Sequence, residues 1–313
     1  MYKRQALLDV RRLRVLRELA ARGTIAATAE ALSFTPPAIS QQLATLEREV
    51  GVALLERDGR SVRLTDAART LVAHTETVLA QLEVAEADLA GLAGAVAGRL
   101  RVAAFQTAAK TFVAATVAAL RRDHPALQLA VDDLEPADSL AALRLTELDL
   151  AVVHEYPFAP RTRHPGLVFI DLAEDPLHVA VPAGDPLAQG AAVRLSDLAA
   201  ATWIAGHEGT ACHDIVIRAA RAAGFEPAIA GRTNDFTLVY ELVAAGLGVS
   251  LIPGIAVERD RPGVRTLPLV EPALTRHIFA AVRAGSESRP SVKAALAYMQ
   301  KAASSRASPT GSS

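Results

Sequence analysis

The side chains best suited to chemistry lie close together between residues 207 and 214. His207, Cys212 and His213 provide two imidazoles and the only thiol of the chain, with Glu208 and Asp214 beside them. A thiol next to a histidine could act as a nucleophile, and two histidines with a thiol could ligate zinc. Because near neighbours in sequence do not easily converge on one atom, we assign no catalytic residue and no metal ligand here. A metal- or redox-sensing role for His207, Cys212 and His213 stays open as an alternative, and an enzyme as a weaker one.

A second set of polar side chains has the chemistry of base recognition. Glutamine amides can pair with an adenine edge through two hydrogen bonds, while serine and threonine hydroxyls can reach a base or a phosphate. The set consists of Thr35, Pro36, Pro37, Ser40, Gln41 and Gln42. We predict that these residues contact double-stranded DNA.

A helix is predicted to position this set. Thr35 followed by two prolines is a helix start, and Gly51 is a helix end. Apolar residues recur on one side of the segment at Ile39, Leu43, Leu46 and Val50, which leaves the polar set facing outward. Shorter helices over residues 9–21 and 24–32 precede it. Two helices joined by a tight turn form a helix-turn-helix, whose second helix fits the DNA major groove.

A basic hairpin follows the predicted helix. Asp58 and Gly59 form a turn signal, and Arg57, Arg60 and Arg63 surround it. Cations on such a hairpin commonly contact the sugar-phosphate backbone or enter the minor groove. The sequence therefore predicts a winged helix-turn-helix over residues 1–65.

The charge is divided between two parts of the chain. The formal net charge of -1 argues, at face value, against a polyanionic partner. Residues 1–64, however, contain eleven Lys and Arg against seven Asp and Glu, a net of +4, and the remaining 249 residues contain 22 against 27, a net of -5. A basic head joined to an acidic body is compatible with DNA binding.

One long helix is predicted to link the head to the body. Over residues 66–97, apolar or small side chains recur at alternating steps of four and three, at Leu71, Thr75, Val78, Leu82, Ala85, Leu89, Leu92 and Val96. This spacing forms a heptad seam, for which a second copy of the same helix is the natural partner. We predict dimerisation through this linker, with burial of the helix against its own body as the alternative.

The body, residues 98–303, alternates short apolar strands with helices, which predicts an α/β fold with largely parallel sheets. No Gly-x-Gly-x-x-Gly follows its first strand and no Walker sequence occurs, so we expect no nucleotide cofactor. The length favours two lobes, one of residues 98–171 with 269–303 and one of residues 172–268. Two chain crossings between them would create a hinged cleft.

Small-molecule sites favour such lobe boundaries and the ends of strands. The candidate cleft residues are Gln106, Thr107, His154, His207, Thr210, Asn234 and Asp235. Helix starts after these strands would offer free backbone N–H groups, which suit an anion. We predict a small-molecule effector there.

Together these features resemble the LysR-type transcriptional regulators. The specific part, Gly23 to Leu71, reads GTIAATAEALSFTPPAISQQLATLEREVGVALLERDGRSVRLTDAARTL and is similar to the winged helix-turn-helix of that family. A weaker similarity covers Val243 to Pro253, in the effector domain. The resemblance implies DNA contacts from Thr35, Pro37, Ser40 and Gln41, and from Arg57 and Arg60 on the wing.

The resemblance also implies a homodimer or homotetramer, operator DNA near promoters, and an inducer between two lobes like those of periplasmic binding proteins. RNA polymerase is a further candidate partner. The single cysteine, Cys212, and the absence of an apolar leader predict a cytoplasmic protein. We predict no membrane span, because the apolar run 237–257 is interrupted by Gly246, Gly248, Pro253 and Gly254. The tail, residues 304–313, is predicted to be disordered. A solute-binding protein and an architectural DNA binder are the remaining rivals; each would lack one of the two predicted domains.

Overall fold

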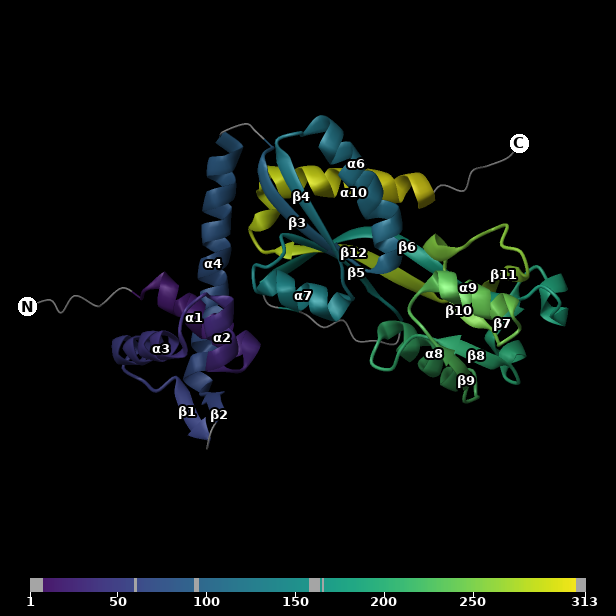
Figure 1. Ribbon diagram of the computed structural model, residues 1–313, viewed down its shortest axis with the longest axis horizontal. Coiled ribbons are helices and arrows are strands. Elements are labelled where there is room, and N and C mark those ends of the chain that lie inside the picture. The colour runs from purple at the N-terminus through teal and green to yellow at the C-terminus, as the bar shows by residue number, and fades with distance from the viewer. Residues whose placement is uncertain (1–7, 59–60, 93–95, 158–163, 165, 308–313) are drawn as a thin grey trace, which may run out of the picture.

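The computed structural model shows a head, a long helix and a larger body in that order along the chain (Figure 1). The residues that it describes are 8–58, 61–92, 96–157, 164 and 166–307.

The head contains three helices and a two-stranded hairpin: α1 (Val10–Arg22), α2 (Ile25–Ala31), α3 (Pro36–Val50), β1 (Leu55–Asp58) and β2 (Ser61–Leu64). The helix ends follow the local signals. Asp9, Thr24 and Thr35 each accept a backbone N–H bond at a helix start, and Gly23 and Gly51 adopt left-handed conformations at helix ends. Apolar residues from all three helices form one buried core, as the helical spacing predicts.

The long helix, α4 (Asp66–Leu92), changes its surroundings along its length. Its first turns pack into the head through Ala68, Leu71 and Val72. Farther along, the large apolar side chains of the predicted seam, Val78, Leu82 and Leu89, are 39%, 44% and 68% exposed. The seam therefore divides into a part that is buried within the chain and a part whose large apolar side chains stay partly or largely exposed.

The body is built on a mixed sheet with strand order β4-β3-β5-β12-β6-β11-β7, and β10 pairs with β6. Its strands are β3 (Gly98–Ala104), β4 (Leu127–Asp133), β5 (Leu150–Glu155), β6 (Leu167–Pro182), β7 (Val193–Arg194), β10 (Ser250–Pro253), β11 (Val264–Glu271) and β12 (Thr275–Arg283). A separate parallel pair consists of β8 (Thr202–Ala205) and β9 (Ala228–Arg232).

Helices cover both faces of the sheet. In the first lobe, α6 (Ala114–Asp123) and α10 (Pro290–Ala307) lie on one face, and α7 (Pro136–Arg144) lies on the other (Figure 1). The start of α6 is preceded by the short α5 (Gln106–Ala108) and the single-turn η1 (Ala109–Val113). In the second lobe, α8 (Ala211–Ala222) and α9 (Phe236–Ala244) pack on β8 and β10. Short 3-10 turns η2 (Pro186–Gln189), η3 (Leu195–Leu198), η4 (Gly254–Ala256) and η5 (Ser286–Ser288) complete the body.

Strand β6 passes from one lobe to the other. Its first half pairs with β12, and its second half pairs with β10 and β11. Residues 167–182 thus form one continuous strand that is shared by both lobes. The expectation of largely parallel sheets was wrong, because β12 runs antiparallel to both β5 and β6. The two lobes are connected by β6 and its neighbour β12. Because these two strands run antiparallel, the strand direction changes at the centre of the sheet.

Two further expectations concern single segments. The apolar run 237–257 folds as α9, β10 and η4, and none of the described helices has the length and apolarity of a membrane span. Helix α10 continues to Ala307, so the first four residues of the predicted disordered tail are helical. Residues 308–313 of that tail lie outside the described residues. The domain and lobe limits given by the sequence stay a prediction.

Candidate DNA interface and effector cleft

The outward face of α3 carries the residues with base-recognition chemistry. Ile39, Leu43 and Leu46 anchor the opposite face in the core of the head. The exposed residues are Thr35, Pro36, Pro37, Ser40 and Gln41, while Gln42 is half-buried. The Thr35 hydroxyl caps the helix by accepting from Ala38 N at 3.4 Å, and the Ser40 hydroxyl donates to the Pro36 carbonyl at 3.1 Å. Gln41 presents its amide to solvent on the first two turns of the helix, where a recognition helix enters the major groove.

The wing is held to the end of α3. One carboxylate oxygen of Glu47, Oε1, accepts from Leu54 N at 2.8 Å and from Leu55 N at 3.0 Å. On the returning side, the Thr65 hydroxyl donates to the Ala53 carbonyl at 2.9 Å. These bonds fix where the hairpin leaves the head relative to the recognition helix.

The three predicted wing arginines are described to different extents. Arg63 is exposed on β2 and lies opposite Glu56 in the register of the hairpin. Arg57 lies on β1 opposite Val62. Arg60 lies outside the described residues. The roles of these residues in DNA binding stay predictions.

At the boundary of the two lobes, Arg276 on β12 is the central buried group. The side chain is 1% exposed, and its Nε donates to Asp175 Oδ2 at 2.7 Å. Nη2 donates to the Thr107 hydroxyl at 3.0 Å, and Nη1 to the Tyr156 hydroxyl at 3.4 Å. The guanidinium carbon also lies 5.0 Å from the ring centre of Phe105. One cation therefore links β12, β6, the residue that follows β5, and the short helix α5.

Asp175 extends this link into the second lobe. Its other oxygen, Oδ1, accepts from Ile255 N at 2.9 Å, in the turn η4 that follows β10. A Cβ placed on Gly254 would lie 2.7 Å from the same oxygen, so only glycine allows this approach. The ion pair between Asp175 and Arg276 thus sits where the chain crosses between lobes.

Three titratable groups around Arg276 have shifted pKa values. Burial lowers the pKa of His154, and the charge of Arg276 lowers it further. Burial also raises the pKa of the Tyr156 phenol and of the Cys212 thiol. The imidazole of His154 packs edge-on against Phe105 and Tyr156. His154, Tyr156 and Cys212 are therefore uncharged at neutral pH around the buried Arg276.

Several predicted cleft residues meet on the side of the second lobe. A Cβ added to Gly206 would lie 2.8 Å from Asn234 Oδ1 and from Thr210 Oγ1, which shows that both side chains surround this glycine. Asn234 Oδ1 accepts from His207 N at 3.1 Å, and its Nδ2 donates across the cleft to Glu135 Oε1 at 3.4 Å. Asn234 therefore holds the loop of His207 and touches the first lobe.

The remaining predicted residues have different positions. Gln106 and Thr107 line a cavity of about 160 Å³ together with Lys110, Phe236 and Thr237. Thr210 caps α8 and Asp235 caps α9. The side of the boundary near Tyr156 and Cys212 encloses only about 20 Å³. The structure thus places Gln106 and Thr107 in an open cavity and leaves His154 in a closed, packed region.

Sequence reasoning missed Arg276, Asp175, Tyr156 and Glu135. A signal for Arg276 exists, since it lies just before the apolar run Ile278 to Val282 in a strand whose members are mostly buried. A charged residue inside a buried strand needs a partner. The sequence contains no indication that this partner is Asp175.

The cluster between residues 207 and 214 does not converge. His207 is exposed, and the Cys212 sulfur lies 3.7 Å from the Tyr156 hydroxyl. His213 Nδ1 lies 3.6 Å from Asp214 Oδ1. Among the described residues, no three His, Cys, Asp or Glu side chains are grouped so that they could hold a metal ion. The backbone of α8 directs these side chains to different surroundings.

A winged helix-turn-helix, a long helix and a hinged two-lobed body with a polar cleft define a DNA-binding regulator of the ligand-responsive class. The family model described as the LysR substrate binding domain matches residues 93–304, and the model of the bacterial regulatory helix-turn-helix protein, lysR family, matches residues 10–69. The chain belongs to the LysR family of transcriptional regulators.

Regulators of several bacteria resemble this chain over nearly its whole length. It is 29% identical to the malonate utilization transcriptional regulator of Klebsiella pneumoniae, covering 93% of this chain and 94% of the relative. It is 28% identical to OxyR of Escherichia coli K12, a DNA-binding transcriptional dual regulator, covering 90% and 92%. A full-length OxyR structure from Pseudomonas aeruginosa shares the fold, with a TM-score of 0.68, 24% identity and coverage of 94% and 95%.

Proposed function

We propose that this LysR-family regulator reads its operator through Thr35, Pro36, Pro37, Ser40, Gln41 and Gln42 of the α3 region and through Arg57, Arg60 and Arg63 of the wing. The observation that carries this assignment is the exposed face of α3, which presents amide and hydroxyl groups while its apolar face is fixed in the core. The arginines would position the head on phosphates, which carry no sequence information. The α3 side chains would supply the base contacts.

We expect Gln41→Ala to weaken binding to the operator by a factor that corresponds to about 1–3 kcal/mol, with little change on unrelated DNA. The reason is that a bidentate amide contact to a base edge is lost while phosphate contacts remain. Fluorescence anisotropy with operator and scrambled duplexes measures both affinities. Arg60→Ala is the comparison variant, which should weaken both duplexes and lower the salt slope by about 1. An operator preference that survives Gln41→Ala would remove this residue from base readout.

For the effector, we propose a site in the cleft between the lobes formed by Gln106, Thr107, His154, His207, Thr210, Asn234 and Asp235. The open cavity beside Gln106 and Thr107 and the contact between Asn234 and Glu135 support it. A bound molecule would change the angle between lobes only if it binds one arrangement better than the other. A thermal-shift screen of metabolites, followed by operator binding with each hit, tests this assignment; hits that never alter operator binding would contradict it.

Dimerisation through the exposed half of α4 is the third part of the proposal. We expect Leu89→Asp to convert dimers to monomers, because Leu89 is 68% exposed in one chain and a charge there would oppose burial against a second copy. Sedimentation velocity measures the change. Gln81→Asp adds the same charge at an exposed position off the seam and should leave the dimer intact. Equal sedimentation coefficients for both variants would contradict dimerisation through the heptad seam of α4.

Relatives from Pectobacterium carotovorum and Dickeya chrysanthemi, each 28% identical, are named hydrogen peroxide-inducible genes activator, which raises the question of peroxide sensing. The single Cys212 cannot form a disulfide within one chain, and burial raises the pKa of its thiol, which lowers the fraction of reactive thiolate. These observations favour a non-covalent effector over a redox signal. Binding to DNA supports a cytoplasmic location, and we propose no enzymatic activity for the chain.

A further inference from the structure

A cavity of about 270 Å³ lies between the head, the linker helix and the first lobe, apart from the cleft between the lobes. Its lining comes from α1, from the middle of α4, from the end of α7 and from the end of β12. Val10 and Leu82, at 38% and 44% exposure, lie toward solvent, whereas Arg17 and Arg283 are buried. The space exists only while all three parts of the chain are packed together.

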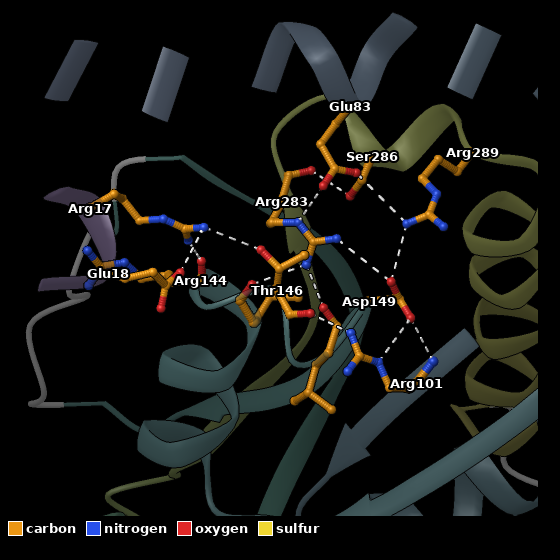
Figure 2. A network of polar contacts seen from close by, with 12 residues as sticks. Arg17, Glu18, Glu83, Arg101, Arg144, Thr146, Asp149, Arg283, Ser286 and Arg289 are labelled. Atoms are coloured by element: carbon orange, nitrogen blue, oxygen red, sulfur yellow. Dashed lines mark hydrogen bonds and ion pairs between the residues drawn. The ribbon is translucent and has the colours of Figure 1, made fainter. Parts of the chain in front are cut away.

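Arginines hold this junction together, as Figure 2 shows. Arg17 of α1 donates to the Arg144 carbonyl at the end of α7, and its Nη2 donates to the Thr146 hydroxyl at 3.4 Å. Arg283 of β12 donates from Nε to Glu83 Oε1 of α4 at 3.0 Å, and from Nη1 to the Leu143 carbonyl at 3.1 Å. The carbonyls at the end of a helix carry partial negative charge, so they are natural acceptors for these cations.

Five buried polar atoms that belong to lining residues lack a hydrogen-bond partner within the described part of the chain. They are Arg17 Nε, Arg144 Nε, Arg283 Nη2, Glu76 Oε1 and Glu83 Oε2. The Arg17 side chain is 4% exposed, so bulk water does not cover it. Burial raises the pKa of Glu76 even though Arg17 and Arg144 lower it. Buried donors and acceptors in native proteins are nearly always bonded to protein, ligand or ordered water, so these atoms favour a polar molecule in this space.

The lining defines the chemistry of the occupant. Five arginines, Arg11, Arg14, Arg17, Arg144 and Arg283, face three carboxylates, Glu76, Glu83 and Glu86. Arg17 is ion-paired with Glu18 at 3.1 Å and Arg283 with Glu83 at 3.0 Å. The remaining lining arginines outnumber the remaining lining carboxylates by three to two, and this formal excess of positive charge favours an anion. Two unbonded Nε donors suit a carboxylate, and the unbonded Glu76 oxygen suits a hydroxyl donor. Apolar side chains complete the wall, namely Val10, Leu79, Ala80, Leu82, Leu167 and Ala284.

We propose that this junction is a second small-molecule site, which takes a small carboxylate with a hydroxyl group and an apolar body. It differs from the effector cleft in location, in lining residues and in the parts that it joins. A molecule bound there contacts head, linker and first lobe at once. By linkage it stabilises the arrangement in which the head is docked on the body, and it thereby acts on the DNA-binding head directly.

The test uses the full chain and three related probes. In calorimetric titrations, 3-hydroxybenzoate is expected to bind with a Kd below about 1 mM. Benzoate, which lacks the hydroxyl, is expected to bind more weakly, and 3-hydroxybenzamide, which lacks the charge, not to bind. Failure of 3-hydroxybenzoate to bind at this level means that the junction holds water only and overturns the proposal. Equal binding of the neutral amide overturns it as well.

Variants then locate the bound probe. Arg144→Gln removes one unbonded donor and should weaken 3-hydroxybenzoate binding at least about tenfold, the effect of losing one charge-assisted contact. Ala284→Leu fills the same cavity from another element and should abolish binding, so the result does not depend on the folding of a single variant. Gln106→Ala alters only the cleft between the lobes and should leave this binding intact.

The opposite pattern of variant effects would place the probe in the effector cleft and not at the junction. If Gln106→Ala abolishes binding of 3-hydroxybenzoate while Arg144→Gln and Ala284→Leu do not, the probe occupies the effector cleft. That result overturns the junction site and leaves the proposed function of the cleft standing. Limited proteolysis gives a second readout, because occupied junction sites should slow cleavage between α4 and the first lobe.

Discussion

Arg276→Met should destabilise the ligand-binding domain by about 3–5 kcal/mol, since it leaves a buried carboxylate without its cation. Asp175 and Arg276 are both 1% exposed, so water cannot replace the missing partner in the folded state. The variant also removes the donors to Thr107 and Tyr156. Urea unfolding followed by the fluorescence of Trp203, the only tryptophan and fully buried in the second lobe, measures the loss.

The double variant Arg276→Met with Asp175→Leu serves as the control. A buried ion pair replaced on both sides by apolar groups often costs little, whereas removing one partner is strongly destabilising. The double variant should therefore recover much of the stability lost in the single one. A single-variant loss below about 1 kcal/mol, or a simple sum of the two single effects, would contradict the view that Asp175 depends on Arg276.

Gly285→Ala should separate the linker helix from the body. Gly285 has φ of +88°, and a Cβ there would overlap the Ala80 carbonyl oxygen and lie 2.6 Å from Val84 Cγ2. Both atoms belong to α4, and the backbone of a helix cannot give way locally. We expect the helix to shift away from η5 as a whole, which weakens the contact of Glu83 with Arg283. Small-angle scattering should show a more extended chain, and operator affinity should change although no DNA contact is altered.

Gly224→Ala is a matched control for this substitution. Gly224 also has φ of +88°, but no atom lies within 4 Å of the added Cβ. It should cost only the strain of a left-handed alanine, about 1–2 kcal/mol, and leave the shape of the chain unchanged. If both variants scatter alike and bind the operator alike, the contact between α4 and η5 does not hold the domains in place.

Much of the head could be predicted because its signals are local. Asp9, Thr24 and Thr35 cap helices that begin one residue later, and Gly23 and Gly51 end them. The apolar spacing of α3 fixes which face enters the core, and this choice leaves the polar face exposed to solvent. Each of these features depends on residues within about four positions, so the order of amino acids is sufficient.

The surroundings of the heptad seam of α4 could be predicted only in part. Its heptad spacing predicted a dimer, and Leu89 remains exposed as a dimer requires. Thr75 of the same seam is instead buried within one chain. Periodicity identifies the apolar face of a helix, but it cannot tell which partner covers each turn of that face.

The sequence by itself determined the winged head, the long linker, the two-lobed α/β body and the family. The tertiary structure decided the direction of β12, the pairing of Arg276 with Asp175 across 101 residues, and the contact of Arg17 with Arg144 across 127. Helix caps and periodicities depend on near neighbours, and any chain segment reveals them. A buried arginine shows only that some partner must exist, and which carboxylate or carbonyl reaches it depends on how distant segments pack together.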